Sequence, residues 1–232
     1  MKPLRLRHRV EYTKNKHSRA VCKDDTIVIR LARNLSKTEE QEHIKNLLRR
    51  MTQLVSEERQ KESIHPFQNL LMGGQTQTVT LATGKKYVFN LYPAKRMEAR
   101  RTATGWKVGI GPGTRRRALH RFLWSLLSKA EEKRITALVH GINDATYCAL
   151  IRSVELGFAT TQWGSCSSRG RIMLNTAMLF LPPSLLRYVI IHELAHRRYQ
   201  NHSAAYWREV ESILPNYEKY CEELKGYRLP TL

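Results

Sequence analysis

The stretch YVIIHELAHRRYQNH, residues 188–202, determines how the rest of the chain is interpreted. It carries the pattern H-E-x-x-H at His192, Glu193 and His196, and a third histidine, His202, follows six residues later. Residues four apart on an α-helix lie on the same face, one turn apart, so His192 and His196 are predicted to point at one cation. Three protein ligands leave a fourth position open on a catalytic zinc ion, and Glu193 is placed to serve as its general base.

The surroundings of the pattern favour a metal site. Leu185 to Tyr199 form a mostly apolar segment that is predicted to be helical, and its polar side chains would be costly to bury without partners. The prolines at 182–183 fit the first turn of a helix. Asn201 tolerates the left-handed conformation of a helix C-cap, which predicts that His202 lies just outside the helix. The alternative is a buried helix whose histidines bond to neighbouring carbonyls, and the spacing favours the metal.

Length and composition indicate a globular protein. A chain of 232 residues with 41% hydrophobic residues can form one large domain or two small ones. No run of eighteen apolar residues is present, and the basic N-terminal sequence MKPLRLRHRV is not followed by the apolar region of a secretory signal. These features predict a cytoplasmic protein without a membrane span.

The formal net charge of +20 predicts attraction to polyanions. Much of this charge lies in residues 1–34 and 95–134. Non-specific binding of nucleic acid and a merely soluble basic surface both remain open, because charge alone reports non-specific affinity. The four cysteines form no C-x-x-C pair, which argues against a cysteine zinc ribbon.

The pattern of residues predicts an α+β protein in three parts. Residues 1–18 are predicted to be a basic arm with little regular structure, residues 19–132 an N-terminal α+β region with hairpins, and residues 133–232 the metal-binding catalytic region. One continuous domain over 19–232 is the alternative. Ser36-Lys37-Thr38-Glu39 has the form of a capping box that opens a helix ending near residue 62.

Further elements follow from periodicity and turn residues. Strands are expected within 19–31, at 76–83 and 86–92 as a hairpin, and at 106–110, 151–160 and 171–175. Two separate helices are expected over 114–132 and 133–149, and a turn-rich loop over 163–168. After His202, Ser203 is expected to cap another helix, and a last amphipathic helix ends near Gly226.

Several segments resemble a known family. These are QWGSCS at 162–167, Arg171-Ile172 with Leu174-Asn175, the proline pair, the segment 188–196, Asn201-His202-Ser203 and Tyr206-Trp207. Together they resemble the YgjP-like metallopeptidase domain, which is related in motif to SprT-like and WLM zinc proteases. The match is most specific over residues 150–217 and looser over 19–149.

The resemblance implies a zincin-like core, in which a twisted, mostly antiparallel sheet packs on the active-site helix, with an N-terminal α/β-hairpin extension. It implies that His192, His196 and His202 bind Zn²⁺, that Glu193 is catalytic, and that the Trp-Gly-Ser-Cys loop packs beside the site. Tyr199 stands where the metzincin signature has glycine, so that clan is not assigned.

The leading hypothesis is a zinc metallopeptidase that acts on a peptide or protein substrate. One alternative keeps the metal but hydrolyses a nucleotide phosphoanhydride (a pyrophosphatase), with arginines between 96 and 121 holding the phosphates. Another is a nucleic-acid-binding protein with a structural zinc. Tyr199, Tyr206 and Arg171 are candidates for stabilising an oxyanion.

Overall fold

The computed structural model describes residues 6–23 and 25–231. These residues form six α-helices and several small sheets, which confirms the α+β class. The chain divides into two compact units, Met1–Glu62 and Ser63–Leu232. Among the described helices, none has both the length and the apolar character that crossing a membrane requires.

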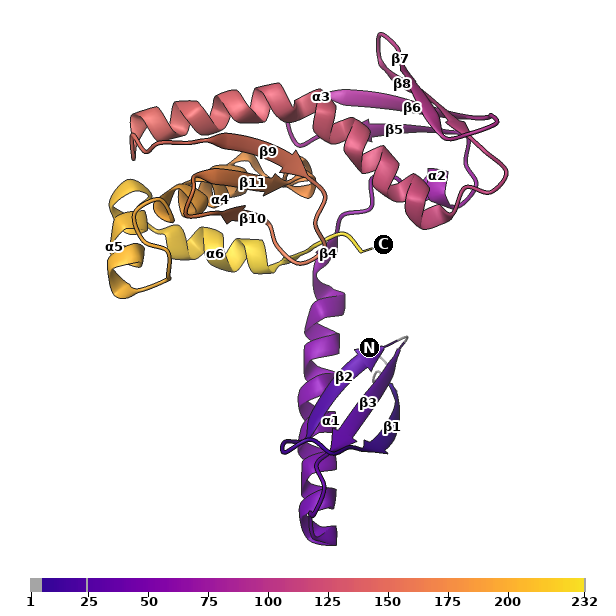
Figure 1. Cartoon of the computed structure of the whole chain (residues 1–232), viewed down its shortest axis with the longest axis vertical. Coiled ribbons are helices and arrows are strands. Elements are labelled where there is room, and N and C mark those ends of the chain that lie inside the picture. Colours follow the sequence, from indigo (N-terminus) through magenta and orange to yellow (C-terminus); the bar gives the residue numbers. More distant parts are fainter. Residues whose placement is uncertain (1–5, 24, 232) are drawn as a thin grey trace. The chain divides into compact units, whose positions relative to one another are not determined.

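The N-terminal unit is a three-stranded sheet with one helix packed on it (Figure 1). Its strands are β1 (Arg7–Tyr12), β2 (Arg19–Lys23) and β3 (Thr26–Leu31), in the order β1-β3-β2. Its helix α1 (Lys37–Gln60) begins at the predicted capping box, in which the Ser36 side chain accepts from the Glu39 backbone N–H while the Glu39 side chain accepts from the Ser36 backbone N–H. The small core consists of apolar side chains from β3 and α1, among them Ile27, Ile29, Leu31, Ile44, Leu47, Leu48 and Met51.

The predicted basic arm differs from what the structure contains. Residues 7–12 form β1, which pairs in parallel with β3 along its whole length. The sequence of β1, RHRVEY, is mostly exposed and rich in charge, and Val10 and Tyr12 alone give only a weak apolar alternation. Its place in the sheet depends on backbone hydrogen bonds to a strand that lies about twenty residues further along the chain. Residues 1–5 of the predicted arm lie outside the described residues.

The second unit begins with a four-stranded sheet of order β5-β6-β8-β7. Its strands are β5 (Thr76–Thr80), β6 (Lys86–Pro93), β7 (Glu98–Arg101) and β8 (Gly105–Ile110). The predicted hairpin is confirmed as β5 and β6, whereas β7 was not predicted. The short helix α2 (Gln68–Leu71) precedes this sheet, and β4 (Glu62–Ser63) pairs with β12 (Tyr227–Arg228).

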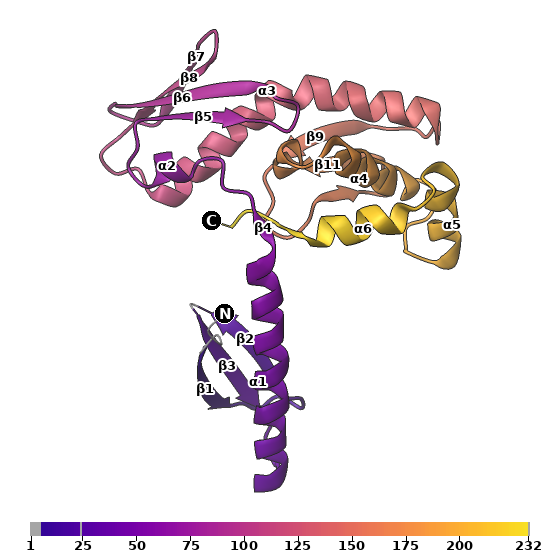
Figure 2. The ribbon, with the colours of Figure 1, turned by 180° about the vertical axis from the view of Figure 1, so that it is seen from behind.

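One long helix, α3 (Arg116–Ala145), replaces the two predicted helices. The expected break at 132–133, which was also the predicted domain boundary, therefore falls inside a helix. The segment Glu131-Glu132-Lys133-Arg134 is charged, yet Glu131 is fully buried inside the helix. The buried apolar positions of α3 continue after it with Ile135, Val139 and Ile142. Regular helical spacing thus runs through the charged segment. Figures 1 and 2 show α3 extending from the β5–β8 sheet to β9.

The remaining part of the second unit carries the predicted site. Strands β9 (Ser153–Gly157), β10 (Gly164–Cys166) and β11 (Arg171–Asn175) form a sheet of order β10-β11-β9. A 3₁₀ turn, η1 (Thr176–Phe180), leads into α4 (Pro183–Ala195), which lies against β10 and β11. Helices α5 (Ala204–Ile213) and α6 (Tyr217–Lys225) both pack on α4.

The prediction of one mostly antiparallel sheet is wrong, because parallel and antiparallel pairs alternate in separate small sheets. In three places a hairpin's second strand pairs in parallel with the strand that precedes the hairpin: β1 with β3, β6 with β8, and β9 with β11. The segment 163–168, expected to be a loop, contains β10, which forms the third of these hairpins with β11. The parallel pairs join strands that are not consecutive, so a sequence pattern does not reveal them.

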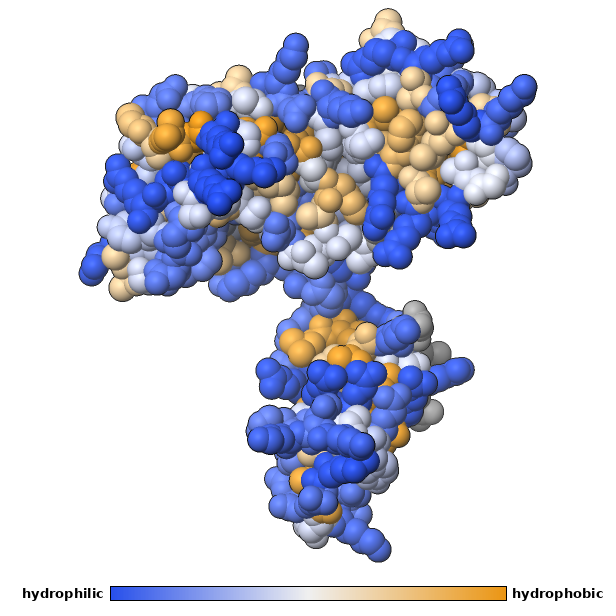
Figure 3. All heavy atoms as spheres, in the orientation of Figure 1, coloured by the Kyte–Doolittle hydropathy of each residue, from blue (hydrophilic) through white to orange (hydrophobic). Residues whose placement is uncertain are grey.

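Apolar side chains are concentrated inside the second unit. Its core includes the fully buried Phe67, Phe89, Trp124 and Tyr206. On the face drawn in Figure 3, hydrophilic side chains cover much of the surface and leave smaller apolar patches between them. This distribution agrees with a strongly basic globular chain.

Candidate metal centre

Helix α4 positions the first two residues of the pattern. Pro183 occupies its first turn, as predicted, and its apolar side chains are buried against the core, which fixes the rotation of the helix. The helix ends at Ala195, and His196 is the C-cap with φ −64° and ψ −10°. It is therefore shorter than predicted. Asn201 is not among the described residues with positive φ, so the expected left-handed cap at that position is wrong.

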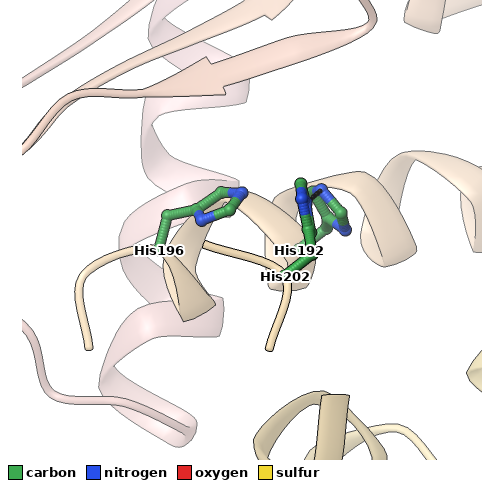
Figure 4. Close-up of side chains that lie close together, drawn as sticks. All are labelled: His192, His196 and His202. Carbon is green, nitrogen blue, oxygen red and sulfur yellow. Dashed lines mark hydrogen bonds between the residues drawn. The ribbon is translucent and has the colours of Figure 1, made fainter. Parts of the chain in front are cut away.

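The structure brings the three predicted histidines together. Figure 4 shows the rings of His192, His196 and His202 gathered at the C-terminal end of α4. One ring nitrogen from each lies within 4.8 Å of the others. The Nε2 atoms of His192 and His202 are 3.1 Å apart. Nitrogen ligands of a tetrahedral zinc ion, each about 2.0–2.1 Å from the metal, lie roughly 3.3 Å from one another, so the observed spacing suits such an ion.

Hydrogen bonding fixes the tautomer of one of these rings. The Nδ1 atom of His196 lies 3.0 Å from the carbonyl oxygen of Tyr199. A carbonyl only accepts, so Nδ1 must carry the proton and donate it, which leaves the Nε2 lone pair free for a cation. Nδ1 of His192 is buried and has no hydrogen-bond partner within the described part of the chain.

Aromatic side chains from α5 surround the histidines. The Tyr206 ring centroid lies 5.4 Å from that of His192 and 4.8 Å from those of His196 and His202. The Trp207 ring stacks on His202 at 5.5 Å. The Tyr206 hydroxyl donates a 3.0 Å hydrogen bond to the backbone carbonyl of His192. These contacts hold the imidazoles in place and cover one side of the site.

Burial keeps two of the imidazoles neutral at pH 7. Burial, with smaller contributions from His196 and His202, lowers the pKa of His192 to about 3. Burial also lowers the pKa of His202, with a smaller contribution from His196. Neutral imidazole is the form that ligates a metal, so this donor set suits zinc and other borderline divalent ions.

Glu193 lies beside the triad in a tightly enclosed position. Its side chain is buried, and burial raises the pKa of its carboxyl group to about 8. It faces the backbone of Gly164 in β10, where a Cβ atom would lie 2.6 Å from Oε1 of Glu193. Only glycine therefore fits beside this carboxylate without displacing it. The Trp-Gly-Ser-Cys segment does pack next to Glu193, although as a strand and not as a loop.

The other candidate residues have different roles in the structure. The hydroxyl of Tyr206 is already bonded to His192, as described above. Arg171 is exposed and forms a 3.0 Å ion pair with Glu155 on the neighbouring strand. Burial raises the pKa of the Cys166 thiol, which does not favour a thiolate nucleophile.

Sequence reasoning missed two supporting residues. Gly164 was expected to lie beside the site only as part of the Trp-Gly-Ser-Cys loop, and its own contact with Glu193 was not predicted. Arg197 donates to the carbonyl oxygens of Leu150, Ser167 and Ser168, and so ties the end of α4 to the segments that flank β9 and β10. No local pattern signals these contacts, because their partners lie about thirty residues or more away in the chain.

Comparisons with known proteins agree with the motif. The family model described as YgjP-like, metallopeptidase domain, matches residues 9–227. No curated protein matches the chain. Two solved structures show partial likeness. The metallopeptidase zymogen abylysin of Pyrococcus abyssi is 25% identical with a TM-score of 0.37, and the match covers 42% of this chain and 99% of that one. The zymogen jannalysin of Methanocaldococcus jannaschii is 22% identical with a TM-score of 0.35, covering 39% and 89%.

The assignment rests on the family model, which spans most of both compact units and includes the three histidines and the glutamate described above. The two matches to solved structures cover less than half of this chain and have low TM-scores, so they do not contribute to the family assignment. The match confirms the resemblance that the sequence motifs indicated. The chain belongs to the YgjP-like metallopeptidase family.

Proposed function

We propose that this chain is a zinc-dependent metallopeptidase in which His192, His196 and His202 hold the metal and Glu193 is the catalytic base. Membership of the family supports hydrolytic metalloenzyme chemistry on peptides or proteins. The observation that carries the residue assignment is the convergence of three imidazole nitrogens within 4.8 Å of one another. We also infer a zincin-type arrangement, since α4 carries His192 and Glu193, and His196 at its C-cap, beside the edge strand β10.

In this proposal the residues around the metal site have distinct roles in the reaction. When bound, a zinc ion supplies Lewis acidity that polarises a carbonyl and makes water acidic near pH 7. The charge of a bound cation would offset the effect of burial on the pKa of Glu193 and keep its carboxylate ionised. In that form Glu193 would take the proton from the attacking water and pass it to the leaving amine. Gly164 leaves the room that the Glu193 carboxylate needs. The Tyr199 carbonyl holds the His196 ring in the tautomer whose Nε2 would be free to bind the metal.

A closed structural zinc site requires a fourth protein ligand. Within the described ranges, the group that includes these three histidines contains no further histidine, cysteine, aspartate or glutamate. This supports an open coordination position and therefore catalysis. Non-specific nucleic-acid binding and a cytoplasmic location remain predictions from charge and from the N-terminal sequence.

The substitution Glu193→Gln tests the proposal. It removes the proton acceptor but keeps the size of the side chain, so we expect peptide hydrolysis to fall by about 10²-fold or more. Zinc content should be unchanged, because Glu193 is not a ligand. Glu211→Gln, on the exposed surface of α5, is the matched control and should keep full activity.

The assay should compare unstructured casein-type peptides with nucleoside triphosphates, each with and without a chelator. Chelator-sensitive cleavage of peptides alone is the expected result. Hydrolysis of triphosphates without peptide cleavage would overturn the peptidase assignment, and undiminished peptide cleavage by the Glu193→Gln variant would remove Glu193 from the mechanism.

A further inference from the structure

A cavity of about 550 Å³ lies between α2 and the N-terminal end of α3, inside the second unit. Its walls include two arginines, Arg116 and Arg117, and two histidines, His65 and His120, above the buried ring of Phe67. None of its lining residues is acidic, and none belongs to the histidine triad. The cavity is therefore a concentration of positive charge outside the proposed metal site.

The N-terminus of α3 lacks the side-chain cap and the acidic residues that commonly stabilise a helix N-terminus. Its N-cap, Arg115, makes no side-chain cap hydrogen bond, and the first turn contains no acidic residue. Arg116 and Arg117 occupy that first turn, where positive charge opposes the helix dipole and where free backbone N–H groups attract anions. Neither arginine has a carboxylate partner within residues 6–23 and 25–231. An anion in the cavity would compensate both the charges and the dipole.

His120 supplies an independent indication. Its side chain is only 5% exposed and lines the cavity. Its Nε2 accepts a 2.8 Å hydrogen bond from Nε1 of Trp124, so the proton of the neutral ring sits on Nδ1. Within the described chain the ring's hydrogen-bond partner is Trp124, and Nδ1 is not among the fully buried atoms that lack a partner, so this N–H is accessible to a ligand. Burial lowers the pKa of His120, and the charges of His65 and Arg116 lower it further, as expected where cationic groups lack a counter-ion.

We propose that this cavity binds an oxyanion head group, a phosphate or a carboxylate, carried by a small organic molecule. Arg116 and Arg117 supply guanidinium donors, and His120, whose side chain lines the cavity, supplies a ring N–H. The volume exceeds what a bare oxyanion fills. A neighbouring, mostly apolar depression of about 530 Å³ shares Leu71 and Arg116 with the cavity and offers room for an apolar body.

Binding can be measured on the full, zinc-loaded chain by calorimetry and by tryptophan fluorescence, because Trp124 contacts His120. The probes are inorganic phosphate, phenyl phosphate and phenylacetate, titrated at fixed ionic strength so that screening of the basic chain stays constant. Phenyl phosphate and phenylacetate distinguish a phosphate from a carboxylate head group. Inorganic phosphate measures the contribution of the head group alone.

The double variant Arg116→Gln/Arg117→Gln should weaken binding of the preferred probe by at least about tenfold, since charge-assisted hydrogen bonds are lost. The control Arg121→Gln/Lys129→Gln removes the same charge from exposed positions of α3 outside the cavity and should leave binding within about twofold. Equal weakening in both variants, or no saturable binding of any probe, would overturn the proposal. The metal-centre proposal is unaffected by either outcome.

Discussion

The Tyr206 hydroxyl shows how a single residue outside the H-E-x-x-H pattern supports the site. It is fully buried and donates to the His192 carbonyl. In Tyr206→Phe the carbonyl loses this donor, so we expect the free energy of unfolding to fall by about 1–3 kcal/mol. Peptide hydrolysis should fall by less than about tenfold, because the hydroxyl is committed to the backbone. Loss of an oxyanion donor would instead cost about 10²–10³ in turnover.

Urea unfolding and steady-state kinetics on the same preparation separate these two roles of Tyr206. Tyr220→Phe, at a partly buried position on α6, is the control and should change neither quantity substantially. A hundredfold loss of turnover with unchanged stability would assign Tyr206 to the substrate and not to positioning His192.

Gly164 gives a second prediction at the scale of one residue. A methyl group at this position would lie 2.6 Å from Oε1 of Glu193, so Gly164→Ala must displace the carboxylate or β10. We expect peptide hydrolysis to fall by at least about tenfold while zinc content is retained, because small displacements of a catalytic group have large effects. Activity assays and metal analysis check this.

Gly141→Ala is the matched control for Gly164→Ala. A Cβ atom at Gly141 has no heavy atom within 4 Å, and the position lies inside α3. This substitution should stabilise the protein by about 0.5–1 kcal/mol and leave activity unchanged. Full activity in Gly164→Ala would show that the Glu193 carboxylate does not need its present position.

The sequence predicted that His192, His196 and His202 lie close together, and local spacing explains much of this prediction. The four-residue interval places His192 and His196 on one face of a helix whatever surrounds them. Gly164 and Tyr206 act through the fold, since their contacts with α4 join distant segments or the next helix. Their residue types carry no signal that distinguishes them from ordinary core or turn residues.

Among the elements, α3 carries a buried carboxylate near its middle whose cationic partners are partly exposed. Glu131 is fully buried, and it accepts hydrogen bonds from Lys85 at 2.8 Å and from Tyr87 and Arg134. Burial alone raises the pKa of this carboxyl group, but the hydrogen bonds from Lys85, Tyr87 and Arg134 outweigh it, so the pKa is lowered overall. The ionised form is therefore the stable one in the folded protein.

A lowered pKa in the folded state predicts how stability changes with pH. The contribution of Glu131 is fully present above the unfolded pKa of about 4.3 and is lost as the pH falls through the folded pKa. Glu131→Gln should reduce the free energy of unfolding at pH 7 by about 1–3 kcal/mol, and the difference from the unmodified chain should shrink towards pH 3. Urea unfolding at several pH values measures this.

The neighbouring Glu132 is exposed on the same helix and serves as the control. Glu132→Gln should change the free energy of unfolding by no more than about 0.5 kcal/mol. A difference between Glu131→Gln and the unmodified chain that stays constant down to pH 3 would show that the charge of Glu131 does not stabilise α3.

Elements with local signals were predicted well, and elements that depend on distant partners were not. The capping box at Ser36 and the β5–β6 hairpin follow from a few adjacent residues. In contrast, β1 becomes a strand by pairing with β3, and β10 by pairing with β11. The predicted break in α3 failed because Glu131 finds partners, Lys85 and Tyr87, on a segment about forty-five residues earlier.

At the scale of the whole molecule, the second unit contains the histidine triad, Glu193 and their aromatic surroundings. The cationic cavity also lies within residues 63–232. The observed division after Glu62 differs from the predicted boundaries at 18 and 132. The two basic stretches, 1–34 and 95–134, do not mark the division after Glu62. The packing of β3 with α1 in the first unit and the apolar core around α3 in the second show where each core lies.

The most direct test of the account is zinc binding measured by equilibrium titration, combined with X-ray absorption on the zinc-loaded protein. The account predicts one zinc per chain with three imidazole nitrogens at about 2.0–2.1 Å. His192→Ala, His196→Ala and His202→Ala should each weaken zinc binding, whereas His140→Ala, at an exposed position of α3, should not. Undiminished zinc affinity in the three site variants, or a sulfur-dominated ligand shell, would contradict it.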